Sequence, residues 1–176
     1  MKFDRQKHHR RSIRLKEYDY SQAGAYYVTI NLQNRECLFG EIVDSEMILN
    51  EAGIMIIEQW KALLERFPNI ELDIYQIMPN HFHGIIVIVG ATLVVAQESN
   101  PTLGNIIGAF KSITTHKYIK GVDNKNWAQF YKRLWQRNYY EHVVRDEKDL
   151  NRIRDYIQSN PANWNEDEEN PNFKKP

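Results

Sequence analysis

Several features that would assign this chain to a class at once are scarce in its sequence. It has a single cysteine, Cys37, so an internal disulfide is excluded and a reducing compartment is expected. No apolar run approaches the roughly 20 residues that a membrane-spanning helix needs. The N-terminus is basic and polar and lacks the apolar core of a signal peptide. We therefore expect a cytoplasmic protein with no membrane partner.

The chain also lacks net charge, but its charges are segregated. Residues 1–16 carry seven Lys and Arg against one Asp, and residues 107–154 carry eleven against five acids. Residues 41–98 have the opposite sign, with nine Asp and Glu against two bases. Basic blocks of this kind suit a polyanion site, but solvated surfaces explain each block equally well. Charge alone does not decide between the two interpretations.

Hydrophobic patterning predicts a single folded domain. The 176 residues and 42% apolar content suit one domain over residues 18–164, with a basic arm at 1–17 and a polar acidic tail at 165–176. From residue 163 on, we expect a mobile chain. Strands are predicted over 26–32, 38–43, 70–78, 82–89 and 139–144, and helices over 50–67, 103–119 and 146–160. The second segment is expected to pair back on the first as a hairpin.

This order of elements favours an α+β sandwich, in which helices flank a mainly antiparallel sheet. A ferredoxin-like arrangement is the natural expectation for it.

Two histidines stand at the start of a predicted strand, in His81-Phe82-His83. Side chains alternate along a strand, so both imidazoles point to one face and Phe82 points to the other. Two neutral imidazoles on one face can hold a divalent metal ion, although they need further ligands. A pair of hydrogen-bonded or exposed histidines would give the same pattern, so the spacing alone is weak support.

The last predicted helix offers a second polar pair. Tyr156 and Asn160 are four residues apart and therefore lie on one face, beside an apolar stripe that includes Ile153 and Ile157. A tyrosine hydroxyl can act as a nucleophile if it is activated, and an amide oxygen can serve a metal ion. Both residues also have ordinary explanations. Tyr156 can pack its ring on the protein with its hydroxyl in water, and Asn160 before a proline is a common end of a helix.

Taken together, these segments resemble a known family. The stretch from Met78 to Ile86 is similar to the metal-binding strand of the single-tyrosine HUH transposases, the insertion-sequence 200-like family. Residues 135–147 and 156–161, with the opening segment 10–14 and residues 18–39, resemble its REP-associated branch. The resemblance covers roughly residues 10–164.

The resemblance implies a fold, an activity and roles for individual residues. It implies that residues 18–164 form an HUH transposase-like catalytic domain. The implied activity is that of an enzyme that nicks and joins DNA through a tyrosine. His81 and His83 match the metal ligands and Tyr156 matches the nucleophile. Asn160 stands where relatives carry Gln as a further ligand. The implied cofactor is Mg²⁺ or Mn²⁺, and the implied partner is single-stranded or hairpin DNA. The resemblance also implies a nucleoid-associated protein that is a monomer or a homodimer. The reaction implied is strand transfer through a 5′-phosphotyrosine intermediate.

Binding to DNA needs cations for phosphates and flat groups for bases. We expect the cations to come from the arm, the second long helix and the segment before the last strand. The candidates are Arg10, Arg11, Arg14, Lys111, Lys117, Lys120, Lys132, Arg133 and Arg137. Each of these residues is equally explained as an ordinary surface charge with no role in DNA binding.

Three other functions fit the sequence. The first is a domesticated protein that binds a specific DNA hairpin without strand transfer. The second is a metal-dependent hydrolase that uses water and forms no covalent adduct. The third is an RNA-binding module with incidental histidines, which would recognise the 2′-hydroxyl.

Overall fold

The computed structural model of the chain describes residues 19–89 and 101–173. Its centre is a four-stranded antiparallel sheet with the order β4-β5-β1-β6. The strands are β1 (Gly24–Asn31), β4 (Ile70–Ile77), β5 (His81–Ile88) and β6 (Tyr140–Val143). The chain order β1-α1-β4-β5-α3-β6 is the ferredoxin-like motif. The predicted fold class, an antiparallel sheet flanked by helices, is confirmed.

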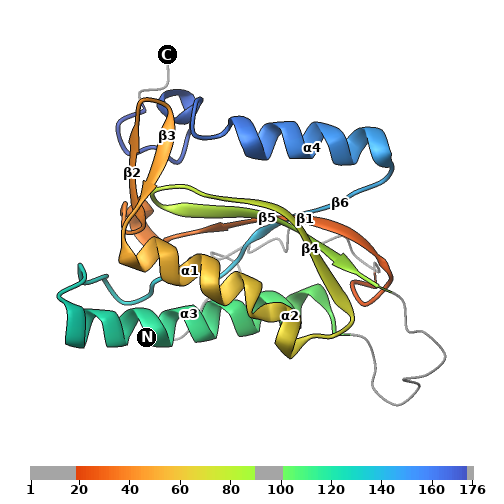
Figure 1. Cartoon of the computed structure of the whole chain (residues 1–176), viewed down its shortest axis with the longest axis horizontal. Helices are drawn as coiled ribbons and strands as arrows, with labels where there is room; N and C mark the ends of the chain where they lie inside the picture. The colour runs from red at the N-terminus through yellow and green to blue at the C-terminus, as the bar shows by residue number, and fades with distance from the viewer. Residues whose placement is uncertain (1–18, 90–100, 174–176) are drawn as a thin grey trace, which may run out of the picture.

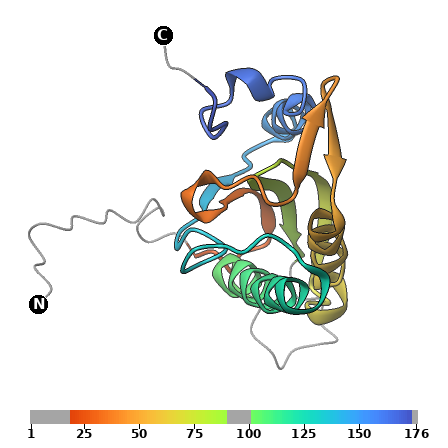
Figure 2. The ribbon, with the colours of Figure 1, turned by 90° about the vertical axis from the view of Figure 1, so that its left-hand side faces the viewer.

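Helices cover both faces of the sheet (Figures 1 and 2). One face carries α1 (Glu51–Lys61), the short α2 (Leu63–Arg66) and α3 (Leu103–Lys125), and the other face carries α4 (Glu147–Ser159). Within the described ranges, none of the helices combines the length and the apolar composition needed to span a bilayer.

The alternation of side chains along β1 and β5 builds two separate cores. Tyr26, Val28 and Ile30 face α1 and α3 in the larger core, together with Phe82 and Ile86 of β5. The intervening residues face α4, where Tyr27 and Ile85 pack against Ile153 and Ile157 in a smaller apolar cluster. His81 and His83 have the same parity as Ile85, so they face α4 as well.

Gly84 leaves space for aromatic rings of the larger core on the face of β5 opposite to the two histidines. A Cβ atom at this position would lie 2.6 Å from a ring atom of Trp60, which is fully buried. The Trp60 and Phe82 rings are in contact, with centroids 4.5 Å apart. A residue larger than glycine would therefore push β5 away from α1.

The segment at residues 38–43 differs from the prediction. Instead of pairing with β1, β2 (Gly40–Val43) pairs with β3 (Glu46–Leu49) in a separate two-stranded sheet. The predicted pairing was wrong because two local turns redirect the chain. Asn34 and Arg35 have positive φ in the 3-10 turn η1 (Gln33–Arg35), and Asp44 and Ser45 have positive φ in the tight turn between β2 and β3.

Two further boundaries lie beyond their predicted positions. Helix α3 continues past residue 119 to Lys125 and ends at Asn126, whose φ of 56° is left-handed. Gly121 does not end the helix, because it is buried against the Trp127 ring within α3. The expectation of a mobile chain from residue 163 on is also wrong for residues 163–173, which include η2 (Trp164–Glu166) and the buried Asn170.

Replacing Gly84 by alanine should lower the free energy of unfolding by about 1–3 kcal/mol, because the new methyl group overlaps the Trp60 ring. Urea unfolding of both proteins measures this difference. Gly108, on the exposed side of α3, is the matched control, since a methyl group added there would have no neighbouring atom within 4 Å. Gly108→Ala should raise stability by about 0.5–1 kcal/mol through helix propensity. Equal effects of the two substitutions would contradict the packing described.

Candidate functional site

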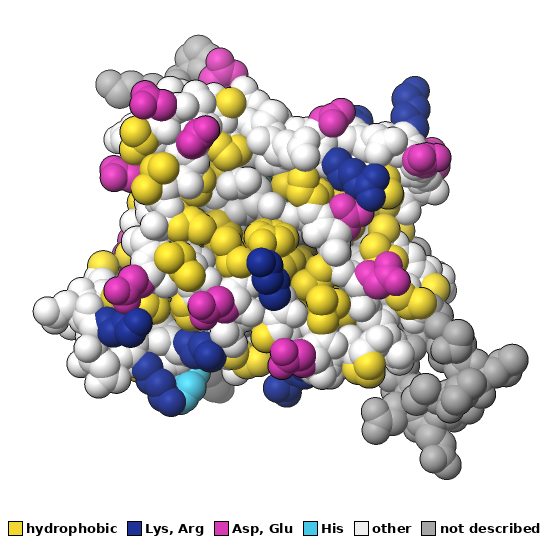
Figure 3. Space-filling view, in the orientation of Figure 1, with side chains coloured by type: hydrophobic (Ala, Val, Ile, Leu, Met, Phe, Trp, Pro, Cys, Tyr) yellow, Lys and Arg dark blue, Asp and Glu magenta, His cyan; other side chains and the backbone are white. Residues whose placement is uncertain are grey.

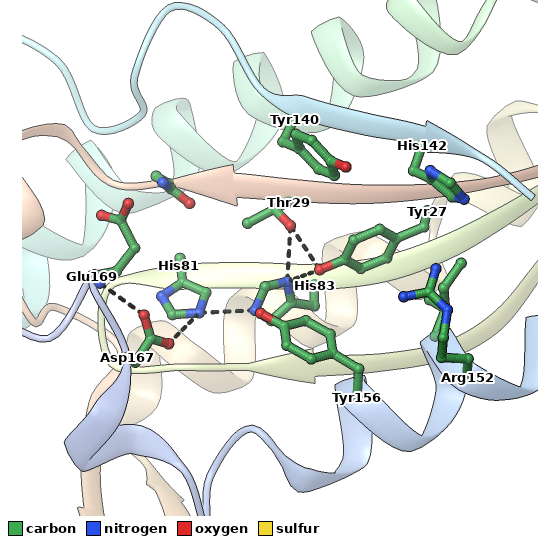
Figure 4. A pocket seen from close by; sticks show the side chains of 12 residues that line it. Tyr27, Thr29, His81, His83, Tyr140, His142, Arg152, Tyr156, Asp167 and Glu169 are labelled. Atoms are coloured by element: carbon green, nitrogen blue, oxygen red, sulfur yellow. Dashed lines mark hydrogen bonds and ion pairs between the residues drawn. The ribbon is translucent and has the colours of Figure 1, made fainter. Parts of the chain in front are cut away.

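A pocket of about 580 Å³ lies between the sheet and α4, and its lining includes both predicted histidines and the predicted tyrosine (Figure 4). Strands β1, β5 and β6 form its floor, α4 forms one wall, and the segment after α4 closes one end. Three segments that are far apart in the sequence therefore meet at one place.

The two imidazoles point toward each other within this pocket. Their Nε2 atoms are 2.9 Å apart, and both side chains are buried, with exposed fractions of 1% for His81 and 3% for His83. Burial lowers the pKa of His81 to about 3. Burial and the neighbouring His81 also hold the pKa of His83 well below its ordinary value. Both rings are thus neutral at pH 7, which is the form that binds metal ions.

Asn80 fixes the tautomer of His81. Its amide nitrogen donates to the backbone carbonyls of Arg35 at 3.1 Å and Glu169 at 2.7 Å, so its oxygen is the atom that faces the ring. That oxygen lies 2.9 Å from His81 Nδ1 and can only accept a hydrogen bond. His81 Nδ1 therefore carries the proton, and its Nε2 presents a lone pair to the pocket.

His83 is held by two hydroxyl groups of β1. The Tyr27 hydroxyl is 2.8 Å from His83 Nδ1, and the Thr29 hydroxyl is 3.0 Å from the same nitrogen. The strand register creates this contact, since Thr29 pairs directly with His83 and Asn31 with His81. The Nδ1 atoms of His81 and His83 are thus both hydrogen-bonded to neighbouring side chains, as is usual for metal-binding histidines.

Tyr156 reaches the same pocket from α4. The helix begins at Asp146, whose carboxylate accepts the backbone N–H of Asp149 at 2.8 Å, and its apolar stripe packs on the sheet through Ile153 and Ile157. The Tyr156 ring lies 5.6 Å from the His83 ring, centroid to centroid, and 52% of the residue is exposed. The two imidazoles and the phenol therefore lie near one another within one chain.

The environment of the phenol has opposing effects on its pKa. Burial raises the pKa of Tyr156, and hydrogen bonding from Asn160 lowers it. The carboxylate of Asp167 disfavours the phenolate and raises the pKa further, while hydrogen bonding from Tyr27 lowers it. The net result is a pKa above the ordinary value, so the free phenol is protonated at neutral pH and needs activation to react.

Asn160 directly follows the last residue of α4 and lines a second cavity together with Tyr156 and Asp167. It is 5% exposed, and its amide nitrogen donates to the backbone carbonyl of Tyr156 at 2.7 Å. Hydrogen bonding with this amide opposes the lowering of the His83 pKa by burial. The amide oxygen of the predicted ligand is the atom left for a further contact.

Several residues that contribute to the pocket were not anticipated. Asp167, in the segment after α4, has a carboxylate oxygen 3.6 Å from His81 Nε2, and burial raises the pKa of this carboxyl. Arg152 lines the pocket and bonds Asp149 at 2.7 Å. Tyr27 and Thr29 looked like ordinary strand residues. An acidic tail and a patterned strand carry no sequence signal for a site, because the contacts depend on tertiary folding.

The histidines, with Asp167 and Asn160, provide nitrogen and oxygen donors in one place. Within residues 19–89 and 101–173, no group of three or more His, Cys, Asp or Glu side chains is placed to hold a metal ion. The pair of imidazoles instead forms an open site, in which Asp167 approaches His81 but does not touch it. Nitrogen and oxygen donors with free positions suit Mn²⁺ and Mg²⁺ better than a structural zinc ion.

The predicted DNA-binding cations have different surroundings. Lys111 donates to the carbonyls of Gln136 at 2.6 Å and Arg137 at 3.1 Å, and burial lowers its pKa to about 8. Its ammonium is therefore engaged in holding the segment before β6, which argues against a phosphate contact. Arg10, Arg11 and Arg14 lie outside the described residues.

The remaining cations are exposed on two parts of the surface. Lys117 and Lys120 lie on α3, on the layer of the molecule opposite α4, and basic side chains gather there beside acidic ones (Figure 3). Lys132, Arg133 and Arg137 lie in the segment before β6. That segment runs along the end of β1, where the N–H of Gln136 donates to the carbonyl of Asn31 at 2.9 Å. Asn31 lines the pocket, so this second group is the nearer one in the fold.

Comparison with known proteins assigns the chain to a family. It is 40% identical over 177 residues to an uncharacterized protein of Haemophilus influenzae, across 92% of this chain and 93% of that protein. It is also 30% identical over 147 residues to a protein of that bacterium provisionally named REP-associated tyrosine transposase, across 82% of this chain and 73% of the relative. The chain belongs to the REP-associated tyrosine transposase family.

The fold agrees with this membership. A solved structure of a REP-associated tyrosine transposase bound to a REP hairpin matches 86% of this chain and 73% of its own, with a TM-score of 0.61 and 20% identity. No family model matches the chain. The resemblance to REP-associated tyrosine transposases that the sequence motifs indicated is thus confirmed for the family and for the fold.

An ion pair that holds α4 on the sheet should make the stability of this family member depend on pH. Arg154 bonds Asp73 of β4, and this hydrogen bonding holds the pKa of Asp73 below its ordinary 3.8, although burial opposes the effect. A carboxyl whose folded pKa is depressed contributes stability above the unfolded pKa and loses it as pH falls through the folded value.

Asp73→Asn should therefore lower the free energy of unfolding at pH 7, by less than about 1 kcal/mol because the pair is partly exposed. The difference from the wild type should vanish as the pH falls below about 3.8. Urea unfolding at a series of pH values measures this convergence. The control is Asp155→Asn, at an exposed position of the same helix. A difference that stays constant down to acid pH would contradict the role of the ion pair.

Proposed function

We propose that this chain cuts and rejoins single-stranded DNA at hairpin-forming repeat sequences, through a covalent 5′-phosphotyrosine link at Tyr156. The observation that carries the proposal is the position of the phenol beside two neutral imidazoles whose Nε2 atoms face each other. Membership of the transposase family supports a reaction on DNA. The hairpin bound by the solved relative supports the class of substrate.

The residues present fit a divalent ion, for which we propose Mg²⁺ or Mn²⁺. His81 and His83 would hold it through Nε2, and the oxygens of Asn160 and Asp167 are the nearby groups able to add to them. The Nδ1 atoms of both rings are hydrogen-bonded to neighbouring side chains, and these bonds orient the rings so that Nε2 is available for the ion. When bound, such an ion supplies positive charge to the oxygens of one phosphate.

In the proposed reaction, Tyr156 Oη forms a bond to the phosphorus and the bond from phosphorus to the 3′-oxygen breaks. The phenol proton passes to solvent and the departing 3′-oxygen takes up a proton. The new link is a phosphodiester like the old one, so its energy is conserved and a 3′-hydroxyl can reverse the step without a nucleotide cofactor. We propose that the phenol and the imidazoles act within one chain, since all three side chains lie near one another there.

The pocket also suits a polyanion that must present one phosphate. Arg152 lines it as an exposed cation, and Arg137 follows Gln136, which bonds the pocket residue Asn31. We propose these two arginines, with Arg133 and Lys132, as contacts to the phosphates next to the cleaved position. Lys117 and Lys120 would contact DNA only where it extends to the opposite layer of the molecule.

The proposal predicts a covalent adduct that depends on one tyrosine. Wild-type protein, incubated with Mn²⁺ and a labelled single strand that contains a hairpin, should give a protein–DNA adduct that survives denaturing electrophoresis. Tyr156→Phe should reduce the adduct at least about 100-fold, because it removes the nucleophile. The variant should still bind the hairpin with an affinity within a few-fold of that of the wild type.

Tyr140→Phe is the matched control, because Tyr140 lines the same pocket and is 48% exposed. It should keep the adduct, and a chelator should abolish the adduct in the wild type. An adduct that persists in Tyr156→Phe would contradict the assignment of the nucleophile. Tight hairpin binding without any adduct in the wild type would instead establish the domesticated DNA-binding protein as the function.

A further inference from the structure

A second polar cluster lies where β6 meets the start of α4, and one carboxylate holds it together. Asp149, in the first turn of α4, bonds His142 Nε2 of β6 through Oδ2 and the Arg152 guanidinium through Oδ1, each at 2.7 Å. The backbone N–H of Arg145 donates to Oδ2 at 3.2 Å. His142 and Arg152 both line the pocket that contains the proposed nucleophile. Figure 4 shows the Arg152 side chain extending from α4 toward the sheet, with His142 above it.

The Asp149 carboxylate is a well-shielded anchor for these two side chains. Hydrogen bonds from Arg152 and His142 hold the pKa of Asp149 well below its usual range, so the carboxyl is ionised at neutral pH. An ionised carboxylate only accepts hydrogen bonds, and His142 Nε2 is therefore the donor to it. The exposed fraction is 14% for the side chain of Asp149 and 71% for that of Arg152. The anchor is thus mostly covered, while the guanidinium is open to a ligand.

Arg152 keeps donors for a ligand after it has bonded Asp149. A guanidinium has five N–H groups in a rigid fork, and the bond to the carboxylate engages Nη2. The donors on Nε and Nη1 can bind an anion, and the fork geometry suits the oxygens of a phosphate. An exposed arginine normally loses side-chain freedom when it binds an anion. Because Asp149 already restricts Arg152, less of this entropy remains to be lost.

The position of Arg152 relative to Tyr156 indicates which phosphate it would meet. The two residues are four apart on α4, so they lie on one face and about 6 Å apart along the helix axis. Both side chains line the same pocket. Consecutive phosphates of an extended strand are separated by a comparable distance. A strand that presents one phosphate to Tyr156 can therefore place a neighbouring phosphate at Arg152.

We infer that Asp149 is a positioning residue, which holds the Arg152 guanidinium in place to bind a DNA phosphate next to the one that Tyr156 attacks. This inference rests on the proposed function, because its ligand is the same DNA strand. The bond from His142 fixes the other carboxylate oxygen on β6, so the guanidinium is tied to the sheet as well as to its own helix. A strand held at this phosphate has fewer ways to present the next one to the phenol.

A scan of single phosphates tests the contact of Arg152 directly. The probe is one hairpin with a single-stranded extension, in which each phosphate of the extension in turn is replaced by an uncharged methylphosphonate. Binding is measured with a chelator present. In the wild type, one replacement should weaken binding about tenfold, because it removes a charge-assisted contact. In Arg152→Gln, the same replacement should weaken binding less than about twofold, since its partner is already lost.

Two outcomes of this scan would overturn the contact. The first is a wild-type profile in which all replacements have the same small effect. The second is a sensitive phosphate whose effect is unchanged in Arg152→Gln. Arg152 is exposed, so its substitution leaves the core of the protein intact.

The positioning role of Asp149 is tested with the same probes. Loss of a negative charge strengthens the general attraction of DNA, so the affinity alone does not report on positioning. Asp149→Asn should reduce the effect of the sensitive replacement to about threefold or less, because the guanidinium is no longer fixed. Asp155→Asn removes the same charge from an exposed position of α4 and should keep the wild-type profile.

A purely structural role of Asp149 gives a different result. A loosened α4 would weaken binding of every probe alike and leave the relative effect at the sensitive phosphate unchanged. That result, or identical profiles for Asp149→Asn and Asp155→Asn, would overturn the role of Asp149.

The binding scan separates this inference from the proposed function. If the wild type forms no DNA adduct but one phosphate depends on Arg152 and Asp149, the cleavage proposal fails and the phosphate site stands. If the adduct forms at Tyr156 but no phosphate depends on Arg152, this inference fails and the cleavage proposal stands.

Discussion

The antiparallel register between β1 and β5 is the constraint on which the site depends. It pairs Thr29 with His83 and Asn31 with His81, and it places Tyr27 on the same face. A shift by one residue would turn both imidazoles into the larger core and expose Phe82 and Ile86 to α4. The register is secured on the opposite face, where Phe82 and Trp60 pack around the space that Gly84 leaves. Packing on one side of the sheet thus positions the polar groups on the other.

The buried polar groups of the pocket are stabilised by hydrogen bonds to neighbouring residues. His81 is held by Asn80, His83 by Tyr27 and Thr29, and Asn80 in turn by backbone carbonyls of η1 and of the segment after α4. Burial keeps both rings neutral, which favours cation binding and makes the pocket unsuited to hold imidazolium groups. The segment after α4 therefore belongs to the site, since it supplies Asp167 and the carbonyl that orients Asn80.

Much of this arrangement follows from local sequence patterns. Period-two alternation predicted that His81 and His83 share a face, and the helical spacing of Ile153 and Ile157 predicted the apolar stripe of α4, with Tyr156 beside it. Both depend on the geometry of a single element. The pairing of β2 with β3, the folded segment after α4 and the engagement of Lys111 with carbonyls before β6 were not predicted. These features depend on turns at non-glycine residues of positive φ and on contacts between distant segments, for which the sequence has no local signal.

The central claim is that the phenol beside the two imidazoles takes the DNA strand. Mass spectrometry of the protease-digested adduct, formed with Mn²⁺ and a hairpin-containing single strand, tests it most directly. The account predicts a nucleotide linked through its 5′-phosphate to the peptide that contains Tyr156, and to no other tyrosine peptide. A nucleotide attached to the peptide of Tyr139 and Tyr140, or attached without preference, would contradict it.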